Sequence, residues 1–151
     1  MRRRTHLKKL GVWTSLILGA IFLMTSTEAF AAESEIKVKI TVGDRVLTAT
    51  LIDNATTRNF ISKFPLTLPM IDIYSREMCY RFPEALPADE AQTSGYEVGD
   101  IAYWTPRHSF VIFYEQNGEV ISNLQKLGRI DSGIEIFNRT GDVDVVFELF
   151  E

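Results

Sequence analysis

The stretch GDIAYWTPRHSFVIFY, residues 99–114, contains two short apolar and aromatic runs that are separated by a turn. The first run follows a Gly-Asp pair, covers residues 101–104 and is closed by Pro106. The second run, residues 110–114, is rich in strand-forming residues and is too short to indicate a helix. Both runs therefore predict β-strands in the middle of the chain and favour a mainly β fold.

The residues on the N-terminal side predict a β-hairpin followed by a short helix. Apolar and polar residues alternate at 36–42 and again at 47–51, and the Gly-Asp pair between these segments is typical of a tight turn. Asp53 and Asn54 then offer a helix cap, and the apolar stripe behind them ends at Pro65.

Between this helix and the central stretch, the sequence predicts further strands and one irregular segment. Residues 66–74 are extended in character and punctuated by proline, and residues 77–82 predict another short strand. Residues 83–95 are rich in Pro, Ala, Asp, Glu, Ser and Gly, which is typical of a surface loop.

The C-terminal third predicts a second hairpin, a second helix and a last strand. The sequence QNGE at residues 116–119 is the strongest short-range hairpin signal of the chain, and residues 120–124 would return as a strand. Ser132 and Glu135 match a capping box and predict a helix of about two turns, with Gly141 at its exit. In the last strand we expect every second side chain to point inward, namely those of Val143, Val145, Phe147 and Leu149.

About eight strands and two short helices point to a closed antiparallel β-barrel, because closure removes the exposed edges of such a strand set. With 151 residues, of which 46% are hydrophobic, the chain can build one packed core. The single cysteine, Cys79, excludes an internal disulfide framework.

Several of these segments together resemble the small bacterial cyclophilin-like family. The resemblance is carried by residues 95–104 and 110–114, by LGRI at residues 127–130 and by REMCY at residues 76–80. It covers about residues 36–151 and implies a cyclophilin-type β-barrel with a helix at each end. It implies little about function, because many members of the family have no assigned activity and a fold alone does not supply one.

The first 31 residues predict a secretory signal peptide. A basic segment is followed by an apolar run at residues 10–24, and the small-x-small sequence at residues 29–31 is a cleavage site. The apolar run is shorter than the roughly 20 residues of a membrane-spanning helix. Arg3 and Arg4 also resemble the twin-arginine pattern, so the Sec and twin-arginine routes both stay open. We expect an exported domain of residues 32–151, periplasmic or extracellular, without stable insertion in the membrane.

The predicted mature chain is acidic. Removal of residues 1–31 takes away five basic residues and Glu28, which leaves 11 Lys and Arg against 19 Asp and Glu and a net charge of −8. A surface of this charge repels nucleic acids and anionic lipids. Nucleic acid is therefore excluded as a partner, and the oligomeric state is left open.

Few residues match known catalytic or metal-binding patterns. The Phe-x-x-Gln-x-Gly-Asp segment of the prolyl isomerases is matched only by the Gly-Asp pair at residues 99–100, and we interpret Arg76 and Arg81 as solvated cations or ion-pair partners. His108 is the one histidine after residue 31, so a zinc site lacks ligands and no metal or cofactor is expected. We interpret Cys79 as a buried, inert thiol.

A binding site is the remaining hypothesis. Tyrosine and tryptophan concentrate in the middle third, and the polar end of each side chain prefers a partner or a wet rim. Trp104 ends a predicted strand, where it would either line a ligand mouth or plug the barrel end. The candidate residues for a cleft at the barrel surface are Glu77, Tyr80, Tyr103 and Trp104.

Three functions from different classes fit these observations. The first is noncatalytic binding of a small molecule or peptide by an exported domain. The second is a divergent peptidyl-prolyl cis-trans isomerase, and the third is a structural or interaction domain for an operon partner. Because the isomerase motif is not matched and no catalytic residue is predicted, the sequence favours the binding function.

Overall fold

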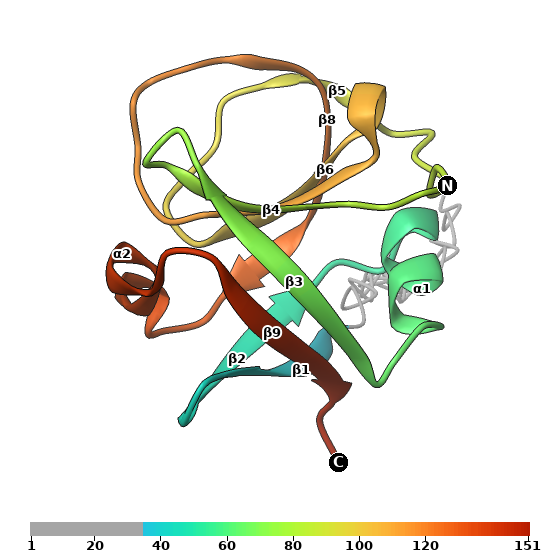
Figure 1. Ribbon diagram of the computed structural model, residues 1–151. Coiled ribbons are helices and arrows are strands. Elements are labelled where there is room, and N and C mark those ends of the chain that lie inside the picture. Colours follow the sequence, from blue (N-terminus) through green and yellow to red (C-terminus); the bar gives the residue numbers. More distant parts are fainter. Residues whose placement is uncertain (1–34) are drawn as a thin grey trace, which may run out of the picture. The chain divides into compact units, whose positions relative to one another are not determined.

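The computed structural model describes residues 35–151, so the predicted signal peptide at residues 1–31 lies outside the described residues. The described part forms nine β-strands, two short α-helices and two 3-10 turns (Figure 1). None of its helices has the length and apolar character needed to cross a membrane. In chain order the elements are β1 (Ile36–Val42), β2 (Arg45–Leu51), α1 (Ala55–Ile61), β3 (Leu66–Ile73), β4 (Glu77–Arg81), β5 (Gln92–Ser94), β6 (Asp100–Trp104), η1 (Thr105–Arg107), β7 (Ser109–Phe113), β8 (Ile121–Ile130), η2 (Ile134–Ile136), α2 (Phe137–Thr140) and β9 (Val143–Leu149).

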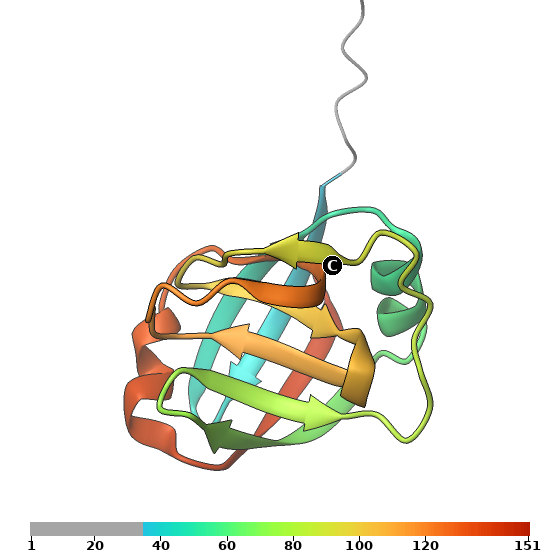
Figure 2. The ribbon, with the colours of Figure 1, turned by 90° about the horizontal axis from the view of Figure 1, so that it is seen from above.

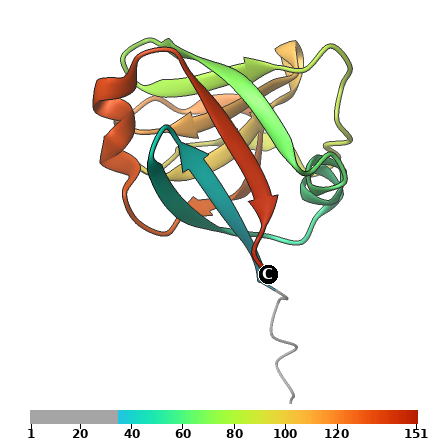
Figure 3. The ribbon, with the colours of Figure 1, turned by 60° about the horizontal axis from the view of Figure 1, so that its bottom comes forward.

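Eight of the strands close into an antiparallel barrel. Their order is β2-β1-β9-β3-β4-β7-β6-β8, and the pairing of β2 with β8 completes the circle. The ninth strand, β5, pairs with the first half of β8 outside this circle (Figure 2). The helices α1 and α2 lie at opposite ends of the barrel (Figure 3). The predicted mainly β fold, a closed antiparallel barrel of about eight strands with two short helices, is confirmed.

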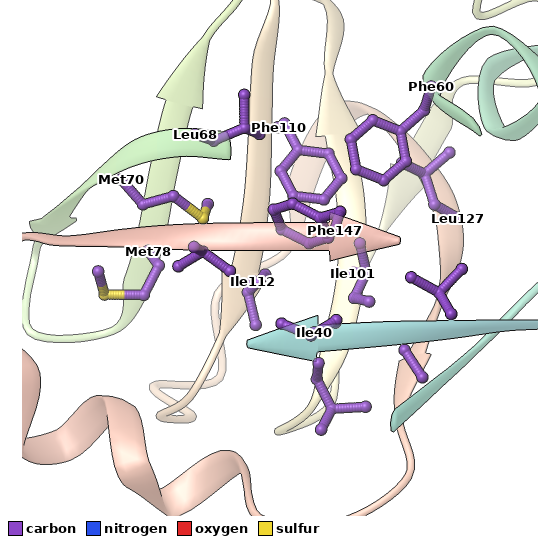
Figure 4. Packing of buried hydrophobic residues seen from close by; sticks show 14 of the residues in the cluster. Ile40, Phe60, Leu68, Met70, Met78, Ile101, Phe110, Ile112, Leu127 and Phe147 are labelled. Carbon is purple, nitrogen blue, oxygen red and sulfur yellow. The ribbon is translucent and has the colours of Figure 1, made fainter. Parts of the chain in front are cut away.

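Three aromatic side chains, one from α1 and two from strands, pack together among aliphatic residues in the barrel interior (Figure 4). The ring of Phe60 stacks on Phe110 at a centroid distance of 4.4 Å, and Phe147 meets both rings edge-on at 5.3 and 5.4 Å. Each such pair stabilises the fold by about 0.5–1.5 kcal/mol, in addition to the stabilisation from the apolar area that it buries. The helix is thus the plug of one barrel end rather than a surface addition.

The prediction for the last strand is correct except at its end. Val145 and Phe147 are fully buried and Val143 packs against the core, but Leu149 is 50% exposed. The pairing of β9 with β3 ends at Phe147, opposite Leu66, so that Leu149 has a neighbouring strand on one side only.

Helix α1 begins where the sequence predicts. The Asn54 side chain accepts a hydrogen bond from the Thr57 backbone N–H at 2.9 Å, as an N-cap does. The same side chain donates to the Lys126 carbonyl at 3.1 Å and so ties the helix to β8. The helix ends at Ile61, ahead of Pro65.

The hairpin predicted at residues 116–119 is wrong. The strands on either side, β7 and β8, do not pair with each other, because β6 lies between them. The side chain of Asn117 accepts hydrogen bonds from the Tyr96 hydroxyl at 2.8 Å and from the Glu119 backbone N–H at 3.0 Å. The Asn-Gly turn therefore belongs to a crossing connection and not to a two-stranded hairpin.

Two further local predictions need correction. No side chain caps the second helix, and Ser132 does not form the predicted capping box, because the N-cap of η2 is Gly133 with a φ of 85°. The result is one 3-10 turn followed by the four residues of α2, although Gly141 does have the predicted positive φ of 59°. The predicted loop at residues 83–95 contains the short strand β5.

Candidate ligand cavity on the outer face of the barrel

The strands β4, β7, β6 and β8 carry a second apolar cluster on the face that points away from the barrel interior. Neighbouring residues of a strand point to opposite faces. Met78 and Ile112 belong to the barrel core, whereas the adjacent Cys79 and Val111 belong to the outer cluster. The buried members of the outer cluster are Cys79, Tyr96, Ala102, Val111, Phe113 and Leu124.

This outer face forms the floor of a cavity of about 480 Å³. Strand pairing arranges the floor in rows, because residues that are partners in register lie side by side. Arg81, Ser109 and Trp104 form the first row, and Cys79 lies beside Val111 in the second. Glu77 and Phe113 form the third row. The cavity thus has an apolar centre between two polar ends, and its volume suits a small molecule.

The polar end on the Glu77 row contains a buried ion pair. Arg76 donates to Glu77 Oε2 from Nε at 3.0 Å and from Nη2 at 2.7 Å, and both side chains are less than 10% exposed. Arg76 Nη1 also donates to the carboxylate of Glu119. The guanidinium lies 5.5, 5.6 and 5.7 Å from the ring centroids of Tyr74, Tyr96 and Phe113. Two carboxylates and three rings therefore satisfy Arg76 within the protein.

The pKa values at this end follow from burial and from the two carboxylates. Burial lowers the pKa of Arg76, but the hydrogen bonds and charges of Glu77 and Glu119 outweigh it and leave the pKa raised. Burial raises the pKa of Glu77, and the neighbouring Glu119 adds to this effect, while Arg76 opposes it. Arg76 is consequently a permanent cation whose charge is already neutralised.

The turn that leads into Arg76 is strained. Tyr74 and Ser75 have φ values of 58° and 48°, in the left-handed region that non-glycine residues rarely adopt. The Arg76 backbone N–H donates to the Ile73 carbonyl at 3.2 Å and closes the turn. Tyr74 lines the cavity and is 73% exposed, so it lies at the mouth. Strain of this kind concentrates at functional sites.

The opposite end of the cavity is cationic. Arg81 is the last residue of β4 and Arg107 is the last residue of η1, and both line the cavity. Within residues 35–151, neither guanidinium has a carboxylate within 4.0 Å. Arg81 pairs with Ser109 in the sheet, and the Ser109 hydroxyl donates to the Arg107 carbonyl at 3.3 Å.

The Trp104 side chain forms the wall beside these cations. Its Nε1–H donates to the Ser122 carbonyl at 2.9 Å, which connects the end of β6 to the start of β8. The residue is partly buried and packs against the outer cluster. It therefore lies on the cavity wall and not in the barrel interior.

Comparison with known proteins places this architecture in a family. A family model described as the cyclophilin-like family matches residues 40–148. The chain belongs to the cyclophilin-like family. The solution structure of a hypothetical protein from Archaeoglobus fulgidus shares the cyclophilin-like fold of this chain, with a TM-score of 0.64 at 18% identity over 80% of this chain and 99% of the other. No curated protein matches the sequence.

The cyclophilin-like domain brings two of the four predicted site residues to the cavity. Glu77 and Trp104 line it, whereas Tyr80 and Tyr103 face the barrel core. The Tyr103 hydroxyl accepts a hydrogen bond from the Leu86 backbone N–H at 2.9 Å, and the Tyr80 ring packs edge-on against Phe82 at 5.1 Å. Both tyrosines thus have partners on the face opposite the cavity.

The other residues that the sequence singled out have clear positions in the cyclophilin-like domain. Cys79 is buried in the cavity floor, and burial raises the pKa of its thiol. Arg76 is an ion-pair partner, as predicted, whereas Arg81 lines the cavity without an ion-pair partner among the described residues. His108 turns its Nδ1 toward the Phe82 carbonyl at 3.3 Å. Residues 35–151 contain no group of three or more His, Cys, Asp or Glu side chains arranged to hold a metal ion.

Sequence reasoning did not select several residues of the cavity. Arg107 comes from η1, and Asn117, Glu119 and Val120 come from the connection between β7 and β8. The path of that connection depends on the position of β6 between its two strands, which no local pattern indicates.

Proposed function

We propose that this domain binds a small molecule or peptide in the cavity on the outer face of β4, β7, β6 and β8, and that it does so without catalysis. The observation that carries the proposal is a preformed cavity of about 480 Å³ whose apolar floor lies between polar ends. Ligand sites of proteins combine an apolar lining with a few placed polar groups in this way.

The exposed side chains at the mouth support this proposal. Tyr74 and Val120 both line the cavity and are 73% and 63% exposed. Apolar surface that is concentrated at the mouth of a cavity gains free energy when a ligand covers it.

The chemistry of the lining supports binding rather than reaction. The Cys79 thiol is buried in the floor with a raised pKa, so it is protonated and a weak nucleophile. The imidazole of His108 contacts the Phe82 carbonyl and does not line the cavity. The cavity therefore lacks a nucleophile paired with a base within the described residues.

A fluorescence titration with N-phenyl-1-naphthylamine, an uncharged aromatic amine, tests the proposal. We expect saturable binding of one molecule per domain, with energy transfer from Trp104, the one tryptophan after residue 31. Val120→Asp should weaken binding by about fivefold or more, because it places a charge at the apolar mouth.

Val46→Asp is the matched control, since Val46 is 61% exposed on β2 and does not line the cavity. It should leave the affinity unchanged. Binding that does not saturate, or that both substitutions weaken equally, would contradict the proposed function.

We also propose that the domain acts outside the cytoplasm. The charged, apolar and small-residue segments of residues 1–31 support this proposal. The net charge of −8 in residues 32–151 is compatible with a domain that stays free of anionic lipid surfaces.

A further inference from the structure

We infer that the ligand of this cavity is a small amphipathic anion, whose carboxylate or phosphate binds Arg81 and Arg107 and whose hydrocarbon body covers the apolar floor. This inference rests on the proposed function and names the chemical class of the ligand.

The arginines at the two ends of the cavity differ in the ion-pair partners that the described residues supply. Arg76 is buried, paired with Glu77 and Glu119 and surrounded by aromatic rings. Arg81 and Arg107 are exposed and have no carboxylate within 4.0 Å among the described residues. The charge that is free to recognise a ligand is therefore the positive charge of the second end.

The fold brings these two cations together around one residue. Arg81 is the partner of Ser109 in the pairing of β4 with β7, and Arg107 precedes Ser109 by two residues. The first row of the floor thus contains the Arg81 guanidinium and the Ser109 hydroxyl, and Arg107 of η1 lines the same cavity. A guanidinium presents paired N–H donors that match the oxygens of a carboxylate or a phosphate.

The rest of the floor matches the body of such a ligand. Beyond the first row, the floor continues with Cys79 and Val111 and then with Phe113. Two residues along a strand advance by about 6.6 Å, so the three rows span about 13 Å. An anionic group at the first row would leave an aromatic or aliphatic body over Val111 and Phe113.

The positive charge at this end of the cavity contrasts with the negative net charge of the domain. Residues 32–151 carry a net charge of −8, yet two arginines at one end of a cavity have no acidic partner among the described residues. At physiological ionic strength charges are screened over about 8 Å, so acids outside the cavity contribute little to the field beside Arg81 and Arg107. The two carboxylates that line the cavity, Glu77 and Glu119, are paired with Arg76 at the other end.

Two probes with the same aromatic body distinguish the contribution of the anionic group to binding from that of the aromatic body. N-phenyl-1-naphthylamine is uncharged, and 8-anilino-1-naphthalenesulfonate carries one added sulfonate. We expect the sulfonate to bind about tenfold or more tightly, as charge-assisted hydrogen bonds do. Arg81→Gln with Arg107→Gln should abolish the preference for the sulfonate, so that the ratio of the two affinities falls from about tenfold or more to about one.

Arg45→Gln serves as the control, because Arg45 is exposed on β2 and does not line the cavity. It should change neither affinity. Equal affinities of the two probes, or equal losses in Arg45→Gln and in the double variant, would overturn the inference while the binding function stands. If neither probe binds, the proposed function itself fails.

Displacement of the bound sulfonate then identifies the anion. The competitors are 2-naphthoate, 2-naphthyl phosphate and the uncharged 2-naphthalenemethanol. Stronger displacement by the carboxylate or by the phosphate than by the alcohol supports the inference. The stronger of the two anionic competitors then indicates which anionic group the cavity prefers. Equal displacement by all three would contradict it.

Discussion

Asp100 of β6 and Arg129 of β8 lie opposite each other in the sheet, and Arg129 Nε donates to Asp100 Oδ1 at 3.2 Å. The other carboxylate oxygen of Asp100 accepts a hydrogen bond from the Glu97 backbone N–H at 2.8 Å. The two residues belong to the segments GDIAYW and LGRI, by which the sequence resembles its family. Both segments therefore serve strand pairing and the turn before β6.

The family resemblance and the candidate site overlap in part, because Glu77, Trp104 and Val111 line the cavity and belong to segments that carry the resemblance. Asp100 and Arg129 stabilise the pairing of β6 with β8. Arg81 and Arg107, which have no ion-pair partner among residues 35–151, lie outside the segments that carry the resemblance. Membership in the family therefore accounts for the fold of the domain and does not by itself assign a ligand.

Closure of the barrel depends on Gly128, the neighbour of Arg129. A Cβ at this position would lie 2.2 Å from the Thr50 carbonyl oxygen and 2.7 Å from Leu51 Cα, both on β2. We expect Gly128→Ala to lower the free energy of unfolding in urea by about 3 kcal/mol or more. Gly95→Ala, where a Cβ meets nothing within 4 Å, should cost less than about 1 kcal/mol. Equal small losses in both variants would mean that β2 and β8 do not approach as described.

Tyr114 makes the stability of the domain sensitive to alkaline pH. Burial and the hydrogen bond to Asp72 raise the pKa of Tyr114 to about 12. The pKa in the unfolded chain is about 10. The folded state therefore holds the proton more tightly, so this stabilisation is complete below about pH 10 and is lost as the pH rises to about 12.

Unfolding in urea between pH 9 and pH 12, compared for the wild type and Tyr114→Phe, measures this effect. The substitution removes the titrating group, so the loss of stability with rising pH should be smaller in the variant. Identical pH dependence of the two proteins would show that Tyr114 titrates normally in the folded state.

We expect no useful acceleration of prolyl isomerisation. The pattern beside the proline pocket of the isomerases is matched only at residues 99–100, and Arg76 is neutralised by two carboxylates. The measurement follows cis-to-trans conversion of a short X-Pro peptide with and without the domain. Acceleration near that of an ordinary cyclophilin, lost in Arg76→Ala or Arg81→Ala, would make catalysis the leading function.

Export predicts a defined mature terminus. Protein isolated from the native host should begin at or next to Ala32 and should be found in the soluble fraction outside the cytoplasm. Sequencing of the N-terminus decides this. A first residue inside the apolar run at 10–24, or a full-length product in the membrane, would rule out cleavage.

The sequence predicts the strands well because each carries its own alternating pattern. Ile36–Val42 and the strand that ends at Leu51 were predicted from alternation alone. The local sequence does not predict which strands pair with each other, because pairing depends on the arrangement of the whole sheet. The Asn-Gly signal at residues 117–118 therefore failed: it predicts a local turn, and it cannot indicate that β6 lies between β7 and β8.

The candidate site was predicted only in part, for a related reason. Glu77 and Trp104 reach the cavity, whereas Tyr80 and Tyr103 do not. Residues 77 and 80 lie three apart on one strand and residues 103 and 104 are adjacent, so each pair must face opposite sides of the sheet. Strand alternation could have shown this from the sequence. Nothing in the local sequence could have brought Arg107 and Glu119 to the same cavity.

The location of the ligand is the central claim, and amide chemical shifts test it most directly. A two-dimensional NMR titration of residues 32–151 with 8-anilino-1-naphthalenesulfonate should shift the amides of Cys79, Ser109, Val111 and Ser122. Contacts between the naphthalene protons and Val111 methyl groups should appear in the nuclear Overhauser spectrum. Shifts confined to residues away from β4, β7 and the start of β8, such as those of β1 and β2, would contradict the account.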